Sequence, residues 1–389
     1  MGNFIKDYLT YTENLESPDS FHIWCCISLI STALRRQAWV DMGYFKIFPN
    51  MYVVIVSDPG VCRKSAAINA AVALFEDLGD IRMSADATTR EALIRALKQC
   101  EATTQMDEGE VYIHSSLTIV SKELSVFLGT GNNDLLALLT DLYDCPPKWE
   151  YRTKNSGIDT IENVWLSLLG ASTPEWLSSS IPISAIGGGF TSRVIFVVES
   201  ESRKKEPFPE LTPAGRAAKE RLKTALEEIT KMKGAFEITK GGKEVFEEWY
   251  RGYSHRDMPD KRFWGYAERK HIHILKLAMV LSVSRAGGMK ITADDVVLAK
   301  DMLDAIEPGM IEAFGAAGRS TESFDIGVVR DIIKSYGKIS KKELLGFIWR
   351  DVSPRVFDLI ISFLLDGGIV ERTFEGGEIY YEWKEGISS

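Results

Sequence analysis

The sequence predicts an α/β protein built on a mostly parallel β-sheet, with helices before the sheet, a helical region after it and a winged helix at the C-terminus. Between residues 51 and 199, short apolar runs alternate with amphipathic stretches, which is typical of parallel strands covered by helices. The runs expected to form core strands are MYVVIV, SLTIV, VWLSLLGAS and RVIFVVES. From Phe324 onward, three amphipathic stretches precede two alternating runs around Gly376-Gly377. Three helices followed by a β-hairpin make a winged helix.

The chain is expected to divide into four regions. The first is a helical N-terminal segment, residues 1–48, and the second is the α/β core, residues 49–205. A charged, proline-bearing linker, SESRKKEPFPELTP, leads from the core into nearly continuous helical periodicity over residues 206–318. The polar stretch GRSTES then separates this helical region from the winged helix, residues 319–389.

Composition and charge exclude several classes of protein. Hydrophobic residues make up 45% of the 389 residues and charged residues 26%, which is ordinary for a soluble globular chain. The longest apolar runs are too short to cross a bilayer and the N-terminus lacks a signal pattern, so a cytoplasmic location without membrane contact is expected. The five scattered cysteines form no C-x-x-C pair, which indicates reduced thiols and no structural zinc. A net charge of −9 excludes a uniformly basic surface but allows a local basic groove or pore.

The stretch VVIVSDPGVCRKSAAINAAVALF, residues 53–75, predicts a strand, a tight loop and a helix around Lys64 and Ser65. A phosphate-binding loop needs these parts, because backbone N–H groups and the helix N-terminus face the anion, the lysine binds the outer phosphates and the hydroxyl binds Mg²⁺. The usual pattern G-x-x-x-x-G-K-[ST] is broken at Asp58 and Arg63, where glycine is expected. A strand–turn–helix with an unrelated Lys-Ser pair is the alternative. The residues expected to bind ATP are Asp58, Pro59, Gly60, Val61, Cys62, Arg63, Lys64, Ser65 and Ala66, with Ser65 also expected to bind Mg²⁺.

These motifs resemble those of minichromosome maintenance (MCM) helicases, which are AAA+ P-loop ATPases. SDPGVCRKS is similar to their phosphate loop GDPGVAKS, with one extra residue before the lysine, and that family also lacks the glycine before the lysine. YRTKNSGIDTIENVWLSLLGASTP resembles their pre-sensor hairpin and sensor strand. GGGFTSRVIFV resembles their Ser-Arg-Phe finger segment, with Val194 in place of Phe. Phage- and prophage-encoded helicase-like P-loop proteins carry a similar arrangement.

The resemblance covers roughly residues 51–305 and implies an AAA+ core, an α-helical lid and a terminal winged helix. An N-terminal DNA-binding barrel of the MCM kind is not expected, because only a short helical segment precedes the core.

ATP hydrolysis needs a carboxylate that orients water at the end of a neighbouring core strand. Glu123, which follows the run SLTIV, is the candidate. Lys122 stands where the family has an aspartate that helps to hold Mg²⁺. A local re-registration of the chain, or Asp141 or Asp144 nearby, would compensate for this change. An exposed glutamate after a core strand is the alternative reading of Glu123.

The resemblance implies further catalytic positions. Ser172 or Thr173 stands at the sensor position that meets the γ-phosphate or the attacking water. Arg193 matches the arginine finger, and Arg269 matches the sensor arginine of the lid; a polar strand end and a surface arginine are the alternatives. The competing candidates for the lid position are Arg262 and Lys276. An arginine that completes a neighbour's site requires head-to-tail contacts between copies, and the resemblance favours a homo-oligomeric ring, with six copies as the expected number.

The stretch PPKWEYRTKNSGIDTIE predicts a β-hairpin that could enter the pore of such a ring. Cations and aromatic residues alternate along its first arm, so the cations would grip DNA phosphates. The residues expected to contact DNA are Lys148, Trp149, Tyr151, Arg152 and Lys154. A solvated charged hairpin with buried aromatic side chains is the alternative. In the winged helix, Arg350, Arg355 and Arg372 have acidic neighbours, so DNA contact and protein contact both stay open there.

The leading functional hypothesis is an ATP- and Mg²⁺-dependent DNA helicase or translocase that works on single-stranded or forked DNA. Replication of a phage, plasmid or mobile element is the expected setting, with a primase or another replication protein as a further partner. Lys122 favours the alternative, a nucleotide-gated DNA-binding initiator or helicase loader with little hydrolysis. A DNA-packaging motor would usually need a nuclease carboxylate cluster, and the sequence contains no such cluster.

Overall fold

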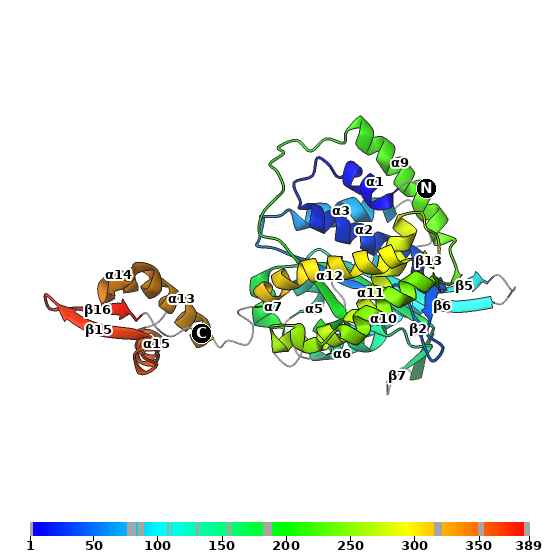
Figure 1. The fold of residues 1–389 in the computed structure, drawn as a ribbon. Coiled ribbons are helices and arrows are strands. Elements are labelled where there is room, and N and C mark those ends of the chain that lie inside the picture. The colour runs from blue at the N-terminus through cyan, green and yellow to red at the C-terminus, as the bar shows by residue number, and fades with distance from the viewer. Residues whose placement is uncertain are drawn as a thin grey trace. The chain divides into compact units, whose positions relative to one another are not determined.

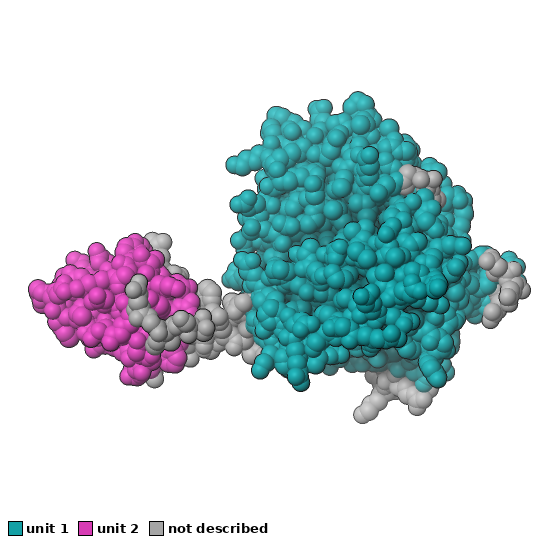
Figure 2. All heavy atoms as spheres, in the orientation of Figure 1, with its two compact units in different colours: residues 1–315 teal, residues 316–389 magenta. Residues whose placement is uncertain are grey.

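The computed structural model describes residues 3–75, 83–84, 89–106, 109, 111–129, 132–153, 157–181, 189–314, 321–348 and 354–384. The chain forms two compact units, Met1–Gly315 (unit 1) and Ala316–Ser389 (unit 2), which Figure 2 colours separately. The expected N-terminal segment, core and helical region therefore lie together in unit 1. The division between the units falls close to the expected boundary at residue 318.

A central sheet organises unit 1, and in the described residues its strand order is β10-β3-β9-β6-β4, with β5 paired to β6. All neighbouring pairs are parallel except β5 and β6. The strands are β3 (Tyr52–Val56), β4 (Met83–Ser84), β5 (Glu101–Gln105), β6 (Val111–Ser121), β9 (Val164–Ser172) and β10 (Val194–Val198). The four apolar runs of the sequence are β3, β6, β9 and β10, so the predicted α/β fold with a mostly parallel sheet is confirmed.

Helices cover both faces of this sheet. In the described part of unit 1 they are α1 (Phe4–Tyr11), α2 (Asp19–Leu34), α3 (Lys64–Phe75), α4 (Arg90–Gln99), α5 (Leu124–Leu128), α6 (Asn133–Tyr143), α7 (Pro174–Ser180), α9 (Pro213–Thr230), α10 (Lys240–Gly252), α11 (Trp264–Ser284) and α12 (Ala293–Ala313). Val53 and Ile55 of β3 share a buried cluster with α2 and α3, whereas the hydroxyl of Tyr52 donates to the carbonyl of Leu139 on α6 (2.8 Å). Figure 1 shows α2 and α3 in the upper part of unit 1 and α6 in the lower part.

Short strands join the outer parts of unit 1 to the core. β1 (Ala38–Asp41) pairs with β2 (Lys46–Ile47) and with β11 (Gly234–Ala235), and β12 (Glu237–Ile238) pairs with β13 (Lys290–Ile291). The predicted hairpin is β7 (Lys148–Thr153) with β8 (Gly157–Glu162). Figure 1 shows β7 at the periphery of the unit.

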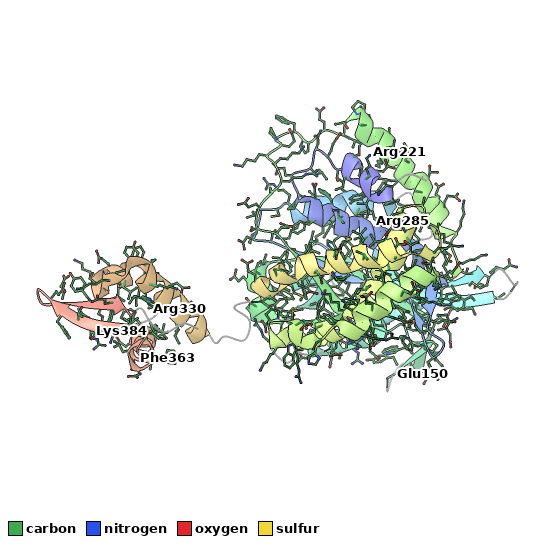
Figure 3. The ribbon with its side chains drawn as sticks, viewed as in Figure 1. Glu150, Arg221, Arg285, Arg330, Phe363 and Lys384 are labelled. Atoms are coloured by element: carbon green, nitrogen blue, oxygen red, sulfur yellow. The ribbon has the colours of Figure 1, made fainter. Side chains whose placement is uncertain are left out.

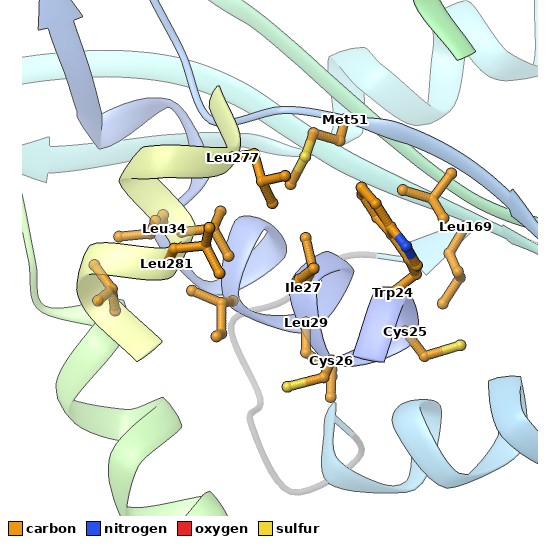
Figure 4. Close-up of a cluster of buried hydrophobic side chains, with 14 of the residues drawn as sticks. Trp24, Cys25, Cys26, Ile27, Leu29, Leu34, Met51, Leu169, Leu277 and Leu281 are labelled. Atoms are coloured by element: carbon orange, nitrogen blue, oxygen red, sulfur yellow. The ribbon is translucent and has the colours of Figure 1, made fainter. Parts of the chain in front are cut away.

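Helix α2 is the centre of the hydrophobic core. From Phe21 to Leu34 every residue except Ile23 is buried, because an apolar surface all round a helix must be covered on every side. Figure 4 shows Leu34 of α2 beside Leu281 of α11, and Trp24 of α2 beside Leu169 of β9 in the sheet. The cysteines are all free and all buried: Cys25, Cys26, Cys62, Cys100 and Cys145.

In its described residues, unit 2 contains three helices and a three-stranded antiparallel sheet of order β14-β16-β15. Its elements are α13 (Thr321–Tyr336), β14 (Lys338–Ser340), α14 (Lys341–Ile348), α15 (Pro354–Asp366), β15 (Val370–Glu375) and β16 (Glu378–Trp383). Ser340 forms the expected cap of α14, since its hydroxyl accepts from the N–H of Glu343 (3.2 Å). Gly376 and Gly377 both have positive φ, as a tight hairpin turn requires. Ser353, the other expected cap, lies outside the described residues.

Candidate nucleotide-binding site

The ends of three neighbouring strands bring the predicted site residues together. We call the edge of the central sheet where β3, β6, β9 and β10 end the carboxyl edge, and the edge where they begin the amino edge. Val56 pairs with Ser172, and Ser121 pairs with Gly170. The N–H of Ser57 also donates to the carbonyl of Ser172 (3.4 Å). The loop after β3, the sensor candidate Ser172 and the segment after β6 therefore meet at the carboxyl edge, which is where ligands bind in open α/β sheets.

The loop between β3 and α3 explains why the phosphate-loop pattern contains glycine. Gly60 has φ +75° and Arg63 has φ +49°, both in the left-handed region that side chains with a Cβ disfavour. Arg63 stands at the position of the second pattern glycine, so it adopts a conformation that costs about 1–2 kcal/mol for a residue other than glycine. Asp58, at the first pattern glycine, is not among the described residues with positive φ, so that departure carries no such cost.

Lys64 is the first residue of α3, and its side chain folds under the loop with 8% of the residue exposed. Its Nζ donates to the carbonyl of Ser57 (2.6 Å), to the hydroxyl of Ser57 (3.1 Å) and to the carbonyl of Asp58 (3.1 Å). Burial lowers the pKa of Lys64, and the negative charge of Glu123 opposes this shift. Anionic oxygens are stronger acceptors than carbonyls, so this ammonium group is placed to exchange its backbone partners for phosphate oxygens.

The rest of the loop presents its outer surface to solvent. Exposed positions include Asp58, Pro59, Gly60, Val61, Arg63 and Ser65, while Ala66 is half-buried. Cys62 is buried, and its Sγ donates to the carbonyl of Glu199, just after β10 (3.6 Å). An anion would therefore reach the open N-terminus of α3, a twelve-residue helix, and the exposed hydroxyl of Ser65. These groups fit a Mg²⁺-bound triphosphate.

Glu123 lies beyond the end of β6 and is exposed, immediately before α5. The hydroxyl of Ser121 donates to the carbonyl of Glu123 (2.9 Å), which fixes the chain at this point. The charge of Glu123 acts on Lys64, so the carboxylate faces the same edge as the loop. Lys122 is half-buried beside it. Thr173, the second sensor candidate, caps α7 by accepting from the N–H of Trp176 (3.3 Å).

Arg193 lies at the opposite edge of the sheet. It ends a short 3₁₀ turn, and the next residue, Val194, pairs with Tyr52 at the start of β3. A five-residue strand spans about 16 Å, so this arginine is well separated from the β3–α3 loop of its own chain. Its Nη2 pairs with Asp144 (2.5 Å), its Nη1 donates to the carbonyl of Gly189 (2.8 Å), and its side chain is 8% exposed.

Arg269 also lies at the amino edge. It is inside α11 rather than at the start, because the helix begins at Trp264. Its Nη1 pairs with Asp144 at 3.4 Å, so the two predicted catalytic arginines share one carboxylate that sequence reasoning did not assign to them. The suggestion that Asp141 or Asp144 compensates for Lys122 at the metal position is wrong, since Asp144 serves these arginines. Asp141 instead accepts from the indole N–H of Trp149 (2.7 Å).

The competing candidates for the lid arginine have other structural roles. Lys276 is buried, with its Nζ bonded to the carbonyl and side-chain oxygens of Asn50 (3.0 and 2.5 Å) and 4.0 Å above the ring of Tyr143. Burial lowers its pKa to about 8. Arg262 pairs with Asp260 (2.6 Å). The partners of these two side chains, Asn50 and Asp260, lie outside the β3–α3 loop.

The buried histidine His273 contacts the turn that carries Arg193 at the amino edge of the sheet. The Nε2 of His273 contacts the carbonyl of Ser192 (3.0 Å), so this nitrogen carries the hydrogen, and its Nδ1 contacts the hydroxyl of Tyr143 (3.3 Å). Burial lowers the pKa of His273 to about 3. The neutral ring therefore links α11 to the turn that presents Arg193.

The β7–β8 hairpin holds its aromatic side chains against unit 1. Trp149 and Tyr151 stack on each other, with ring centroids 6.0 Å apart. The hydroxyl of Tyr151 donates to Glu91 on α4 (3.2 Å). Lys148 pairs with Glu150, labelled in Figure 3, at 2.7 Å. The side chain of Arg152 and the whole of Lys154 lie outside the described residues, so the structure places the base of the predicted DNA contact but not its tip.

No protein-family model matches this chain, and a search of curated proteins found no similar sequence. None of the helices in the described ranges is both long and apolar enough to span a bilayer. The described residues also contain no group of three or more His, Cys, Asp or Glu side chains placed to hold a metal ion.

Proposed function

We propose that this protein is a P-loop ATPase of the AAA+ class that moves along DNA as a head-to-tail ring, with ring-forming helicases as the model. The observation that carries the proposal is the position of Lys64 and Arg193 at opposite ends of two hydrogen-bonded strands, β3 and β10. An arginine so placed serves a phosphate site only when another copy supplies that site.

In this proposal each side chain has a defined part. Lys64 and the N–H groups of the loop hold the outer phosphates, and Ser65 binds Mg²⁺, which supplies charge neutralisation when bound. Glu123 orients the attacking water, and Ser172 contacts the terminal phosphate from the neighbouring strand. Arg193, together with Arg269, completes the site of the adjacent copy after release from Asp144.

We assign DNA contact to the β7–β8 hairpin of unit 1. Its aromatic residues fix the first arm to α4 and α6, so a pull on the hairpin would be transmitted to the core. Lys148, Arg152 and Lys154 are the proposed phosphate contacts. Trp149 and Tyr151 are proposed to support the hairpin rather than to stack on bases, because their polar atoms already have partners within unit 1.

Unit 2 has the element order of a winged helix, but its surface is less suited to DNA. The exposed face of α15 carries Leu359 and Phe363, which are 59% and 58% exposed, and Phe363 is labelled in Figure 3. Several cations of this unit are paired with carboxylates: Arg330 with Asp331, Lys338 with Glu375, Lys341 with Asp358 and Lys384 with Glu371. Of the three arginines named from the sequence, only Arg372 has a described side chain.

Steady-state ATPase measurements with and without single-stranded DNA test the proposal. We expect turnover that DNA stimulates and that Lys64→Ala abolishes, with Glu123→Gln retaining nucleotide binding but losing turnover. Lys231→Ala is the control, because Lys231 is exposed and pairs with exposed Glu228 near the end of α9. Mass measurement with an ATP analogue should show a ring, and a persistent monomer would contradict the role of Arg193.

A second candidate function is a nucleotide-gated DNA-binding protein with little hydrolysis. Lys122 beside Glu123 favours it, because a cation at the metal-binding position opposes Mg²⁺. Tight ATP binding without turnover, in the presence of DNA, would support this candidate over the motor.

A further inference from the structure

The outer side of the phosphate loop contacts two segments that lie outside the strand–loop–helix motif. One is the loop between α1 and α2, residues 12–18, and the other is the segment after β10, residues 199–206. The hydroxyl of Ser202 donates to the carbonyl of Val61, and the buried hydroxyl of Ser17 donates to the carbonyl of Arg63 (3.0 Å). The conformation of the phosphate loop is therefore set partly by these flanking segments.

The ion pair between Glu16 and Arg63 is the main contact from the α1–α2 loop. Glu16 Oε2 lies 2.6 Å from Arg63 Nε, and Arg63 Nη1 donates to the carbonyl of Gly60 (3.2 Å). The side chain of Arg63 is thus bent back over its own loop and held there. Because Arg63 has the unfavourable positive φ described above, an external contact that fixes its side chain also favours this backbone conformation.

Glu16 is itself held in position before it meets Arg63. Its Oε1 accepts from the N–H of Glu206 (2.9 Å), and its carbonyl accepts from the N–H of Arg203 (3.1 Å). The guanidinium of Arg203 donates to the carbonyl of Leu15 (2.8 Å). The carboxylate is therefore preorganised by the segment after β10, and it contacts the phosphate loop from a fixed base.

We propose that Glu16 is a positioning residue that keeps the phosphate loop in its anion-binding conformation by holding Arg63 in the left-handed region. The expected effect on nucleotide affinity rests on the proposed function, whereas the effect on the loop conformation does not. In the usual pattern, glycine makes the positive φ at this position accessible. Here the contact of Glu16 with Arg63 stabilises that φ instead. The N-terminal helices would then influence nucleotide affinity although they do not touch the ligand.

A matched control exists in the same N-terminal segment. Asp7 of α1 pairs with Arg221 of α9, labelled in Figure 3, at 2.6 Å. The side chains of this pair are 19% and 55% exposed, against 17% and 56% for Glu16 and Arg63. The two ion pairs thus have the same length and nearly the same exposure, but only the Glu16–Arg63 pair contacts the phosphate loop.

Hydrogen exchange of the nucleotide-free protein tests the positioning directly. We expect Glu16→Ala to speed several-fold the exchange of the amides of Val61, Ala66 and Ala67, which donate to the loop carbonyls of Asp58 and Arg63. Asp7→Ala should leave those amides unchanged. Equal exchange in the two variants would overturn the inference, whether or not the protein binds nucleotide. Thermal unfolding of both variants checks that each is folded, and Glu16→Gln serves as a milder second variant.

Nucleotide affinity, measured with a fluorescent ATP analogue, tests the consequence. We expect Glu16→Ala to raise the Kd about fivefold and Asp7→Ala to leave it unchanged. Arg63→Gly is the background in which no residue needs to be held at positive φ, because glycine adopts that conformation freely. The double variant Glu16→Ala/Arg63→Gly should then match Arg63→Gly alone.

The outcomes separate the two proposals. If the natural chain fails to bind the analogue, the proposed function fails, while the exchange experiment still decides the role of Glu16. The positioning role is wrong if the natural chain binds the analogue and Glu16→Ala weakens binding as much in the Arg63→Gly background as in the natural chain.

Discussion

The two edges of the central sheet hold their charges in different ways. At the carboxyl edge, the ammonium of Lys64 is bonded to backbone carbonyls and to a hydroxyl beneath an exposed loop. At the amino edge, Arg193 and Arg269 share the carboxylate of Asp144. A ligand at the first edge needs only to replace neutral acceptors, whereas the second edge must lose an ion pair before its cations can act. In the proposed function, the carboxyl edge would therefore bind its ligand directly, whereas the amino edge would be held inactive by its ion pairs.

The largest expected effect comes from variants that inactivate the carboxyl edge in one copy and the amino edge in another. Lys64→Ala and Arg193→Ala should each abolish turnover, since loss of an arginine finger alone costs about a thousandfold. An equal mixture of the two variants should regain about a quarter of the natural activity if the subunits assemble randomly, because intact loops then meet intact arginines across some interfaces. ATPase assays of the mixture measure this recovery. Lack of recovery, once exchange of labelled subunits is demonstrated, would contradict a shared site.

A smaller effect is expected from crowding the turn that carries Arg193. A methyl group added at Gly189 would lie 2.6 Å from Thr140 Cγ2 and 3.2 Å from Arg193 Nη1, so the turn must shift. Gly189→Ala should lower turnover about tenfold through misplacement of the arginine, with nucleotide affinity unchanged. Gly252→Ala is the control, because an added methyl group there meets nothing within 4 Å. If Gly189→Ala also lowered the nucleotide affinity, the amino edge would influence binding at the carboxyl edge.

A lower pH should destabilise the folded protein through His273, which lies at the amino edge. The unfolded chain takes up a proton near the ordinary histidine pKa of 6.5, while the buried ring stays neutral until its pKa of about 3. The folded state therefore loses stability as the pH falls from about 6.5 towards 3, by at most about 1.4 kcal/mol per pH unit for one histidine. Denaturant unfolding at several pH values measures the slope, and His273→Gln should reduce it. His22 and His114, with pKa values lowered to about 3 and 4, account for part of what remains.

The smallest effect concerns the unusual lysine of the carboxyl edge. Lys122→Asp should raise turnover about two- to fivefold by removing a cation near the metal and supplying a ligand, and it should lower the Mg²⁺ concentration at half-maximal rate. Lys122→Ala separates the two causes, since it only removes the charge. Unchanged Mg²⁺ dependence in both variants would mean that this side chain does not face the metal.

The sheet was accessible to sequence reasoning because its strands are nearly continuous apolar runs. β3 is buried at all five positions, and such runs between amphipathic stretches leave few alternatives to a covered parallel sheet. The strand–loop–helix segment around Lys64 was also predictable, since β3, the loop and α3 are contiguous in the sequence. The positive φ of Arg63 was beyond prediction from the chain alone, because its compensation comes from Glu16, 47 residues away.

The partners of the arginines illustrate the same limit. Asp144 is 49 residues from Arg193 and 125 from Arg269, and the pattern of the sequence offers no signal for either pairing. In the β7–β8 hairpin, alternation correctly separates aromatic from charged side chains. It does not reveal that Trp149 and Tyr151 contact α6 and α4, because these contacts depend on the orientation of the hairpin relative to the two helices.

The burial of every cysteine gives the molecule a built-in reporter. Cys62 lies in the phosphate loop and Cys145 directly follows Asp144, so the two edges each contain one thiol that reagents reach only when the local structure opens. Labelling rates at these two positions would time the opening of each edge separately, without any engineered probe. If nucleotide protects Cys62 and speeds labelling of Cys145, binding at the carboxyl edge loosens the amino edge of the same sheet.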